Sequence, residues 1–184
     1  MENNSKSWQC VLSEKGPDLK LFKARFDHMQ NPRNDKTERM IILESDDAVN
    51  VVAITSKQQM VFVRQYRFGI GYATLELPGG IIDQGEEVEL AAKRELEEET
   101  GFGLGNWKKL GKIPSNPVFM DSYIYHYLAQ DIEAVGTQQL DDGEDVEVVL
   151  LSVEEVFQLF KQNSFQHPHT VNALVRYFVY TQKI

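Results

Sequence analysis

The residues of this 184-residue chain with the clearest potential for chemistry are glutamates that cluster between positions 86 and 99. On a helix, Glu95 lies one turn from both Glu98 and Glu99, so the three carboxylates point roughly the same way. Like charges at this spacing repel each other, and a helix that needed only solubility would interleave lysines. Hard divalent cations, which take oxygen ligands, supply the missing positive charge. The spacing therefore predicts a divalent-metal site on one helix face.

Two further charged residues can complete this site. Arg94 precedes Glu98 by four residues and can hold one carboxylate in place through charge-assisted hydrogen bonds. Glu86, in the loop before the helix, can approach the same centre as a metal ligand, or it can serve only to orient Arg94. The alternative for the whole segment is an acidic helix face that is merely solvated.

The acidic segment resembles the Nudix box, and every specified position of that motif is matched. The matching residues are Gly80, Glu86, Arg94, Glu95, Leu96, Glu98, Glu99, Gly101 and Phe102. The resemblance implies a metal-dependent hydrolase with the Nudix fold. It also implies that Glu95 and Glu99 bind the metal directly, that Glu98 bridges or lies close by, and that the carbonyl of Gly79 is a further ligand.

Residues outside the box narrow the resemblance to one branch of these enzymes. The stretch 61–80 (VFVRQYRFGIGYATLELPGG) is similar to ADP-ribose and nucleoside-diphosphate-sugar pyrophosphatases, which carry Arg-Gln-Tyr-Arg and then Glu-Leu-Pro before the box glycine. Pro117, sixteen residues after Gly101, matches a proline of that branch. ADP-ribose-selective relatives commonly have glycine next and a glutamate shortly after, whereas residues 116–122 read NPVFMDS. The resemblance therefore implies nucleoside-diphosphate sugars in general as substrates.

The resemblance also indicates where the general base lies. Enzymes of this branch take it from a loop outside the box, and the acidic stretch 141–147 (DDGEDVE) occupies that region. Glu144 is our first candidate and Glu147 our second, while a solvated acidic loop is the alternative reading.

Two arginines are candidates for contacts with the diphosphate. Arg67 lies at the end of an expected strand that leads towards the box, and a guanidinium fork matches two phosphate oxygens. Arg64 is a second candidate on the same strand, and a surface ion pair is the alternative for Arg67. Phe119 can stack on a nucleobase, as can Tyr123 and Tyr125, although core packing explains these aromatic residues equally well.

These residues together predict a hydrolytic mechanism. Magnesium, with manganese as an alternative, withdraws charge from the two phosphates and lowers the pKa of a bound water. A carboxylate then takes the proton of that water, which gives a nucleoside monophosphate and a sugar phosphate. Two other functions stay open: a Nudix hydrolase for nucleoside triphosphates, dinucleoside polyphosphates or capped RNA, and a non-catalytic nucleotide-sugar sensor.

The elements that must position these residues can be predicted from hydrophobic patterning. Residues 87–100 favour a helix with Val88, Leu90, Ala91, Ala92 and Leu96 on its buried side, and Gly101 ends it. Ser152 to Glu155 is a capping box that opens a helix through about residue 161, and residues 169–181 form a last amphipathic helix. Alternating or β-branched runs predict strands at 8–13, 19–26, 40–43, 48–55, 59–66, 74–77, 107–113, 123–129 and 146–151.

This order of elements predicts a mixed α/β fold, of the α+β kind, with one sheet sandwiched by helices. Residues 1–45 are expected to form an antiparallel strand meander that precedes a Nudix hydrolase domain at 46–184. In the related branch such a meander is often exchanged across a two-fold dimer, so the resemblance implies a homodimer.

Composition excludes several other classes. A net charge of −9 argues against general nucleic-acid binding and against adsorption to anionic membranes. No apolar run is long enough to cross a membrane, and residues 1–6 lack the hydrophobic stretch of a signal peptide. The single cysteine, Cys10, rules out an internal disulfide and is expected to be a half-buried strand residue. We therefore expect a cytoplasmic enzyme, and the resemblance implies that its substrate is a small nucleotide sugar.

Overall fold

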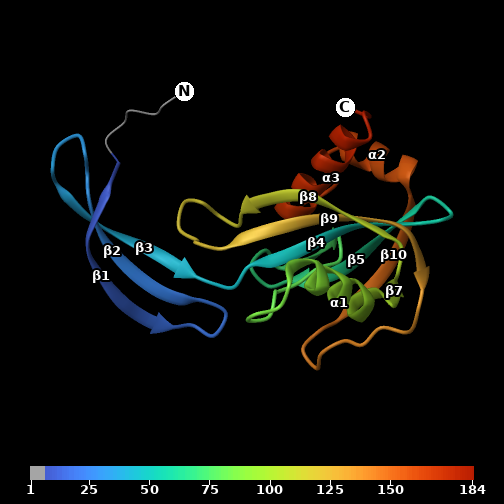
Figure 1. Cartoon of the computed structure of the whole chain (residues 1–184), viewed down its shortest axis with the longest axis horizontal. Coiled ribbons are helices and arrows are strands. Elements are labelled where there is room, and N and C mark those ends of the chain that lie inside the picture. Colours follow the sequence, from blue (N-terminus) through green and yellow to red (C-terminus); the bar gives the residue numbers. More distant parts are fainter. Residues whose placement is uncertain (1–6) are drawn as a thin grey trace. The chain divides into compact units, whose positions relative to one another are not determined.

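The computed structural model describes residues 7–184, which form two compact units (Figure 1). The first unit comprises residues up to 46 together with 114–122, and the second comprises 47–113 and 123–184. Residues 1–6, the polar start that we predicted to lack a signal sequence, lie outside the described residues. Among residues 7–184, no helix is both long and apolar enough to cross a membrane.

The first unit is a three-stranded antiparallel sheet, which confirms the predicted meander. Its strands are β1 (Gln9–Asp18), β2 (Lys23–Gln30) and β3 (Thr37–Glu44), paired in chain order. The predicted strand at 19–26 was wrong in its first half, because the Leu19 N–H donates to the Phe22 carbonyl and Lys20 adopts a left-handed φ of 69°. Cys10 is exposed on β1 rather than half-buried.

The second unit is built on a mixed sheet of seven strands. Its main path runs β10 (Val146–Ser152), β5 (Gln59–Arg67), β4 (Ala48–Thr55), β9 (Tyr123–Ala134) and β7 (Phe102–Gly103). β6 (Tyr72–Glu76) pairs with β5, and β8 (Asn106–Pro114) pairs with β9. β4 and β9 are parallel, whereas β5 pairs antiparallel with β4, β6 and β10.

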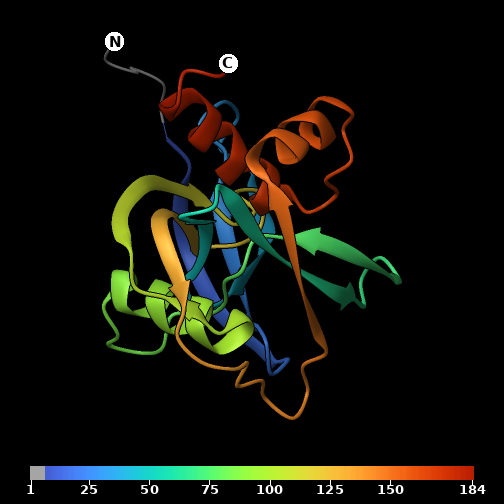
Figure 2. The same ribbon diagram turned by 90° about the vertical axis from the view of Figure 1, so that its right-hand side faces the viewer.

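Helices cover both faces of this sheet, as Figure 2 shows, so the predicted sandwich is confirmed. One core layer joins the sheet to α2 (Val153–Lys161) and α3 (Pro168–Tyr180), and the other joins it to α1 (Val88–Thr100). β5 serves both layers, because Phe62 packs towards α2 and α3 while its neighbour Val61 packs towards α1. The capping box at the start of α2 is present as predicted.

Candidate active site

The helix α1 carries most of the predicted metal-binding carboxylates. Ala91, Ala92 and Leu96 are buried in the core layer under α1, which fixes the rotation of the helix against the sheet. Leu90, predicted to be buried with them, is 54% exposed, so that prediction was wrong. The helix ends at Gly101, whose φ of 71° and N–H bond to the Glu97 carbonyl make the expected glycine cap.

Arg94 is the hub of an ion-pair network on this helix. Its Nε and Nη2 donate to the two oxygens of Glu86 at 3.0 and 2.9 Å. Its Nη1 donates to Glu95 at 2.8 Å and to Glu98 at 2.9 Å. The hydrogen bonds from Arg94 hold the pKa of Glu86 below its ordinary value. Both oxygens of Glu86 are therefore engaged, which is the orienting role that we considered beside metal ligation.

Glu99 lies deeper than the other carboxylates, with 4% of its surface exposed. It accepts the Gly79 N–H at 2.8 Å and the Gln65 side-chain amide at 3.3 Å. Burial, with repulsion from Glu95 and Glu144, raises the pKa of Glu99 to about 8 against the hydrogen bond from Gly79. Burial likewise raises the pKa of Glu95. The site thus concentrates more negative charge than its arginine neutralises.

Gly79 belongs to a loop that passes very close to β4. The carbonyls on either side of it, those of Pro78 and Gly80, accept the N–H groups of Val51 and Val49, each at 2.9 Å. A Cβ on Gly79 would lie 2.0 Å from the Val49 carbonyl oxygen, and its φ of 153° is one that favours glycine. The close approach places the Gly79 N–H on Glu99.

We expect Gly79→Ala to destabilise the fold by about 3 kcal/mol or more, because backbone must move to admit the methyl group. Urea unfolding of the metal-free protein measures the change. Gly136→Ala is the control, since no atom lies within 4 Å of its Cβ position. Equal stabilities for the two variants would contradict the close approach of the Gly79 backbone to β4.

Arg67 and Glu144 line one pocket of about 430 Å³ in the second unit. The pocket walls are the end of β5 with the turn after it, residues 65–69, and the loop at 143–146. Arg67 donates to the buried Glu76 through Nε at 2.7 Å and Nη2 at 2.6 Å. Glu144 is exposed, and its carboxylate accepts the Asp141 N–H at 3.0 Å. The structure therefore brings these two residues together, and Glu144 is close enough to raise the pKa values of Glu95 and Glu99.

Arg64 and Glu147 are not brought to the carboxylates. They oppose each other in the β5–β10 register and form an exposed ion pair of 3.0 Å. Strand alternation places Arg64 on the same side as Phe62, the face that α2 and α3 cover, whereas Gln65 points to Glu99 on the other.

Pro117 and Phe119 lie in the first unit. The Leu43 N–H donates to the Phe119 carbonyl at 2.7 Å, which attaches their segment to β3. Tyr123 and Tyr125, also weighed as base-stacking residues, belong to β9 in the second unit, where Lys112 lies over both rings.

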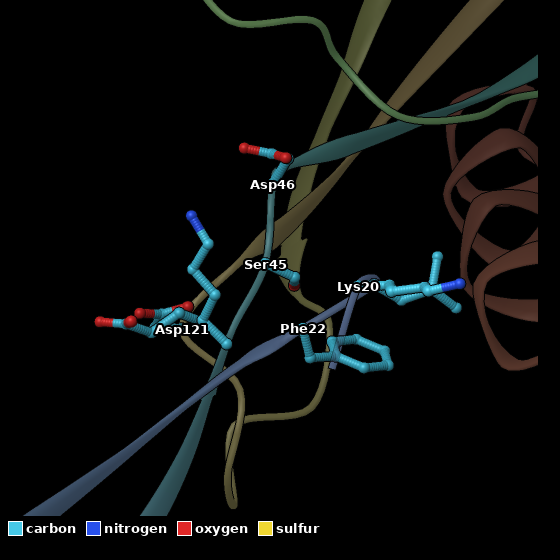
Figure 3. Close-up of a pocket in the computed structure, with 8 residues that line it drawn as sticks. Lys20, Phe22, Ser45, Asp46 and Asp121 are labelled. Carbon is cyan, nitrogen blue, oxygen red and sulfur yellow. The ribbon is translucent and has the colours of Figure 1, made fainter. Parts of the chain in front are cut away.

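A separate pocket of about 300 Å³ also lies in the first unit. Figure 3 shows Asp46 and Asp121 on one side of it and Lys20 and Phe22 on the other. Its lining carries both positive and negative side chains, and it includes none of the catalytic, metal-binding or substrate-binding candidates from the sequence. It offers no concentrated charge for a metal or a diphosphate.

Comparison with known proteins identifies the family to which the fold and the carboxylate site on α1 belong. The family model described as NUDIX domain matches residues 44–174, which is well over half of the chain. The chain belongs to the NUDIX family. A similar solved structure is the crystal structure of an ADP compounds hydrolase. It superposes with a TM-score of 0.83 at 25% sequence identity, covering 97% of this chain and 98% of that one.

Similar sequences include two from bacilli. The chain is 31% identical over 156 residues to the methanol dehydrogenase activator of Bacillus methanolicus, covering 84% of each protein. It is 30% identical over 142 residues to the ADP-ribose pyrophosphatase of Bacillus subtilis strain 168, covering 77% of each. The Nudix resemblance and fold predicted from the sequence are thereby confirmed, and the chain is a Nudix hydrolase.

Nudix enzymes generally use a divalent metal ion, and the donor chemistry here fits one. In their present arrangement no three His, Cys, Asp or Glu side chains of residues 7–184 converge closely enough to hold an ion, because Glu95 and Glu98 both face Arg94. Among residues 7–184 the buried Glu99 forms no salt bridge, and the charge of Arg67 only partly offsets the effects that raise its pKa. Carboxylates whose pKa values are raised by burial and mutual repulsion are the groups that a hard cation would stabilise in the ionised form.

Sequence reasoning missed several residues of this Nudix site. Gln65 contacts Glu99, and the buried Glu76 holds Arg67 with help from Thr74 and His167. Glu76 was visible as part of the Glu-Leu-Pro run, but its partner could be found only by pairing β5 with β6. His167 comes from the start of α3, more than ninety positions away along the chain.

Proposed function

We propose that this protein is a magnesium-dependent pyrophosphohydrolase that cleaves the diphosphate of nucleoside-diphosphate sugars, ADP-ribose or a similar compound. The observation that carries the proposal is the half-buried Glu95 and the buried Glu99, two neighbouring carboxylates whose pKa values are both raised, beside a backbone loop that only glycine can form. The similarity to an ADP-ribose pyrophosphatase and an ADP compounds hydrolase supports a nucleotide sugar as substrate.

Each of the polar groups has a role in the proposed reaction. Arg67 binds phosphate oxygens through the donors of its guanidinium that Glu76 does not use. Glu144 accepts the proton of the attacking water, and Arg94 holds Glu86, Glu95 and Glu98 in place. Glu95, Glu99 and the Gly79 carbonyl are the proposed metal ligands, with Glu98 close by. The bound cation would offset the charge of the phosphates and lower the pKa of water.

A substrate panel tests this function against its alternatives. With magnesium, kcat/KM should be at least about tenfold higher for a nucleoside-diphosphate sugar than for nucleoside triphosphates or dinucleoside polyphosphates, a difference of about 1.4 kcal/mol in transition-state stabilisation. A preference for triphosphates would favour the second Nudix activity. Tight binding of ADP-ribose without any turnover would favour a sensor. Repeating the assay with manganese identifies the ion that supports turnover best.

We also propose a two-fold homodimer in which the segment 1–45 contributes to the interface. The sheet of the first unit leaves large apolar side chains exposed, and exposed apolar surface of this kind is typical of a protein–protein interface. The large apolar side chains left exposed in the first unit are Trp8, Val11, Leu12, Leu19, Leu21, Met40, Ile41 and Val118. The occupant proposed for this surface is a second copy of the chain, as the related branch implies.

Light scattering after gel filtration should give twice the monomer mass at micromolar concentration. The double substitution Val11→Glu with Leu12→Glu places charge at two exposed apolar positions of β1 and should shift the population towards monomer. Leu104→Glu, at a 65% exposed position of the second unit, should leave the mass unchanged. A wild-type monomer would contradict the proposal.

A cytoplasmic location, and the lack of nucleic-acid and membrane partners, also stay predictions.

A further inference from the structure

We propose that Glu76 is a positioning residue, which fixes the guanidinium of Arg67 at the substrate pocket through a buried two-pronged ion pair. The inference rests on the proposed function, because it assigns Arg67 a diphosphate to bind. The two parallel bonds, Nε to Oε1 at 2.7 Å and Nη2 to Oε2 at 2.6 Å, fix both the distance and the plane of the guanidinium.

The carboxylate of Glu76 is itself held by its surroundings. It is 1% exposed, and Thr74 donates a hydrogen bond to the same oxygen that accepts from Arg67 Nε. The other oxygen lies 3.2 Å from Nδ1 of His167, a ring that also lies 3.1 Å from the Thr170 hydroxyl. Each oxygen of Glu76 therefore has two polar neighbours, and the group cannot turn without losing them.

Charge balance supports a fixed ion pair rather than a neutral contact. Burial alone would raise the pKa of Glu76, but the hydrogen bond from Arg67 and the other neighbours hold it below its ordinary value. Burial also lowers the pKa of His167 to about 4, so this imidazole is neutral at pH 7. Arg67 is then the only full positive charge in contact with Glu76 among the described residues.

The pocket side of Arg67 is left for a ligand. The side chain remains 42% exposed and lines the same pocket as Glu144. Two of its five N–H groups go to Glu76 in the described hydrogen bonds, which leaves three for phosphate oxygens. An arginine without such a partner would lose side-chain freedom when substrate binds, whereas the ion pair with Glu76 orders Arg67 beforehand. A displacement of about 1 Å at such a residue can cost about a hundredfold in rate.

A double-mutant cycle tests the role. Glu76→Gln keeps the size of the side chain but replaces one acceptor oxygen by an N–H donor that faces its donors. We expect kcat/KM for a nucleoside-diphosphate sugar to fall about tenfold to a hundredfold in the wild-type background. In an Arg67→Ala background the same change should cost less than about twofold, since the residue that Glu76 positions is gone. Equal losses in both backgrounds, or no loss in either, would overturn the proposal.

Two further variants separate positioning from folding. Thr74→Val removes the hydroxyl that donates to Glu76 at nearly constant volume. It should lower kcat/KM less than Glu76→Gln does, and this loss should also disappear in an Arg67→Ala background. If Glu76→Gln does not fold, the cycle with Thr74→Val decides alone. Glu154→Gln, which removes an exposed carboxylate partner of Gln158 on α2, should leave kcat/KM unchanged. A comparable loss in Glu154→Gln would show that the assay reports general destabilisation and would overturn the proposal.

Binding of ADP with magnesium, measured by calorimetry, distinguishes this inference from the proposed function. If Glu76→Gln weakens ADP binding only when Arg67 is present, the positioning role holds even for a protein that cleaves no nucleotide sugar. If nucleotide sugars are cleaved but ADP binding and kcat/KM show no coupling between the two residues, the proposed function stands and the positioning role is refuted.

Discussion

Glu99→Gln is expected to lower nucleotide-sugar hydrolysis by at least about a hundredfold at saturating magnesium. Loss of a residue that merely supports a metal ligand typically costs 10- to 100-fold, and glutamine here removes an anionic ligand itself. The side chain keeps its size, and its amide oxygen can still accept the Gly79 N–H that binds Glu99 at 2.8 Å. We therefore expect α1 and its core contacts to remain intact. Steady-state rates across a magnesium titration measure the effect.

The stability of the metal-free variant provides a second readout. The pKa of Glu99 is raised to about 8 in the folded protein, so between its ordinary value and pH 8 the folded state binds more protons than the unfolded state. Stability from this group is consequently lost as the pH rises through that window, and Glu99→Gln should be no less stable than wild type at pH 7. Glu97→Gln, on the exposed side of α1, is the control and should keep full activity. A Glu99→Gln enzyme with more than half of wild-type turnover would contradict the ligand assignment.

Glu144→Gln is expected to lower turnover by at least about a hundredfold, which is the usual minimum for removing a general base. Carboxylates that bind metal stay ionised and weakly basic, so the acceptor should lie outside the box. Glu144 lies on an exposed loop and lines the same pocket as Arg67, near enough to Glu95 and Glu99 to raise their pKa values. Glutamine can still accept the Asp141 N–H, so the loop should keep its turn and substrate should still bind with magnesium.

Glu147→Gln is the comparison that assigns the base. Glu147 pairs with Arg64 in the exposed register of β5 and β10, so its loss should leave most of the turnover. An active Glu144→Gln enzyme together with an inactive Glu147→Gln enzyme would move the role three residues along. Full activity in both would make the loop at 141–147 a solvated acidic turn.

Regular elements with strong local signals could be predicted from the sequence. β4 has the predicted bounds because residues 48–55 are nearly all apolar and β-branched, and α1 ends where Gly101 forces it to. The strand predicted at 19–26 begins too early. Apolar and basic residues alternate there as in a strand, but the left-handed backbone of Lys20 forms a turn, so β2 begins only at Lys23. Leu90 is exposed because the helix needs only a narrow stripe of alanines and Leu96 against the sheet.

From residue spacing alone, the candidate site could be predicted only within one continuous segment, whereas Arg67 and Glu144 were found through the family resemblance. Helical spacing brings Arg94 to the glutamates of α1, and Glu86 lies in the loop just before the same helix. The partners of Arg67 and Glu99 depend on how β5, β6 and α3 pair and pack, which no local pattern encodes. Arg64 illustrates the same point, because strand register alone paired it with Glu147.

Product analysis of the wild-type reaction tests the central claim most directly. A nucleoside-diphosphate sugar incubated with the protein and magnesium should give nucleoside monophosphate and sugar phosphate in equal amounts by phosphorus NMR. A chelator should stop the reaction, and added magnesium should restore it. Failure to cleave any nucleotide sugar, or release of inorganic phosphate or pyrophosphate instead of two monophosphates, would contradict the account.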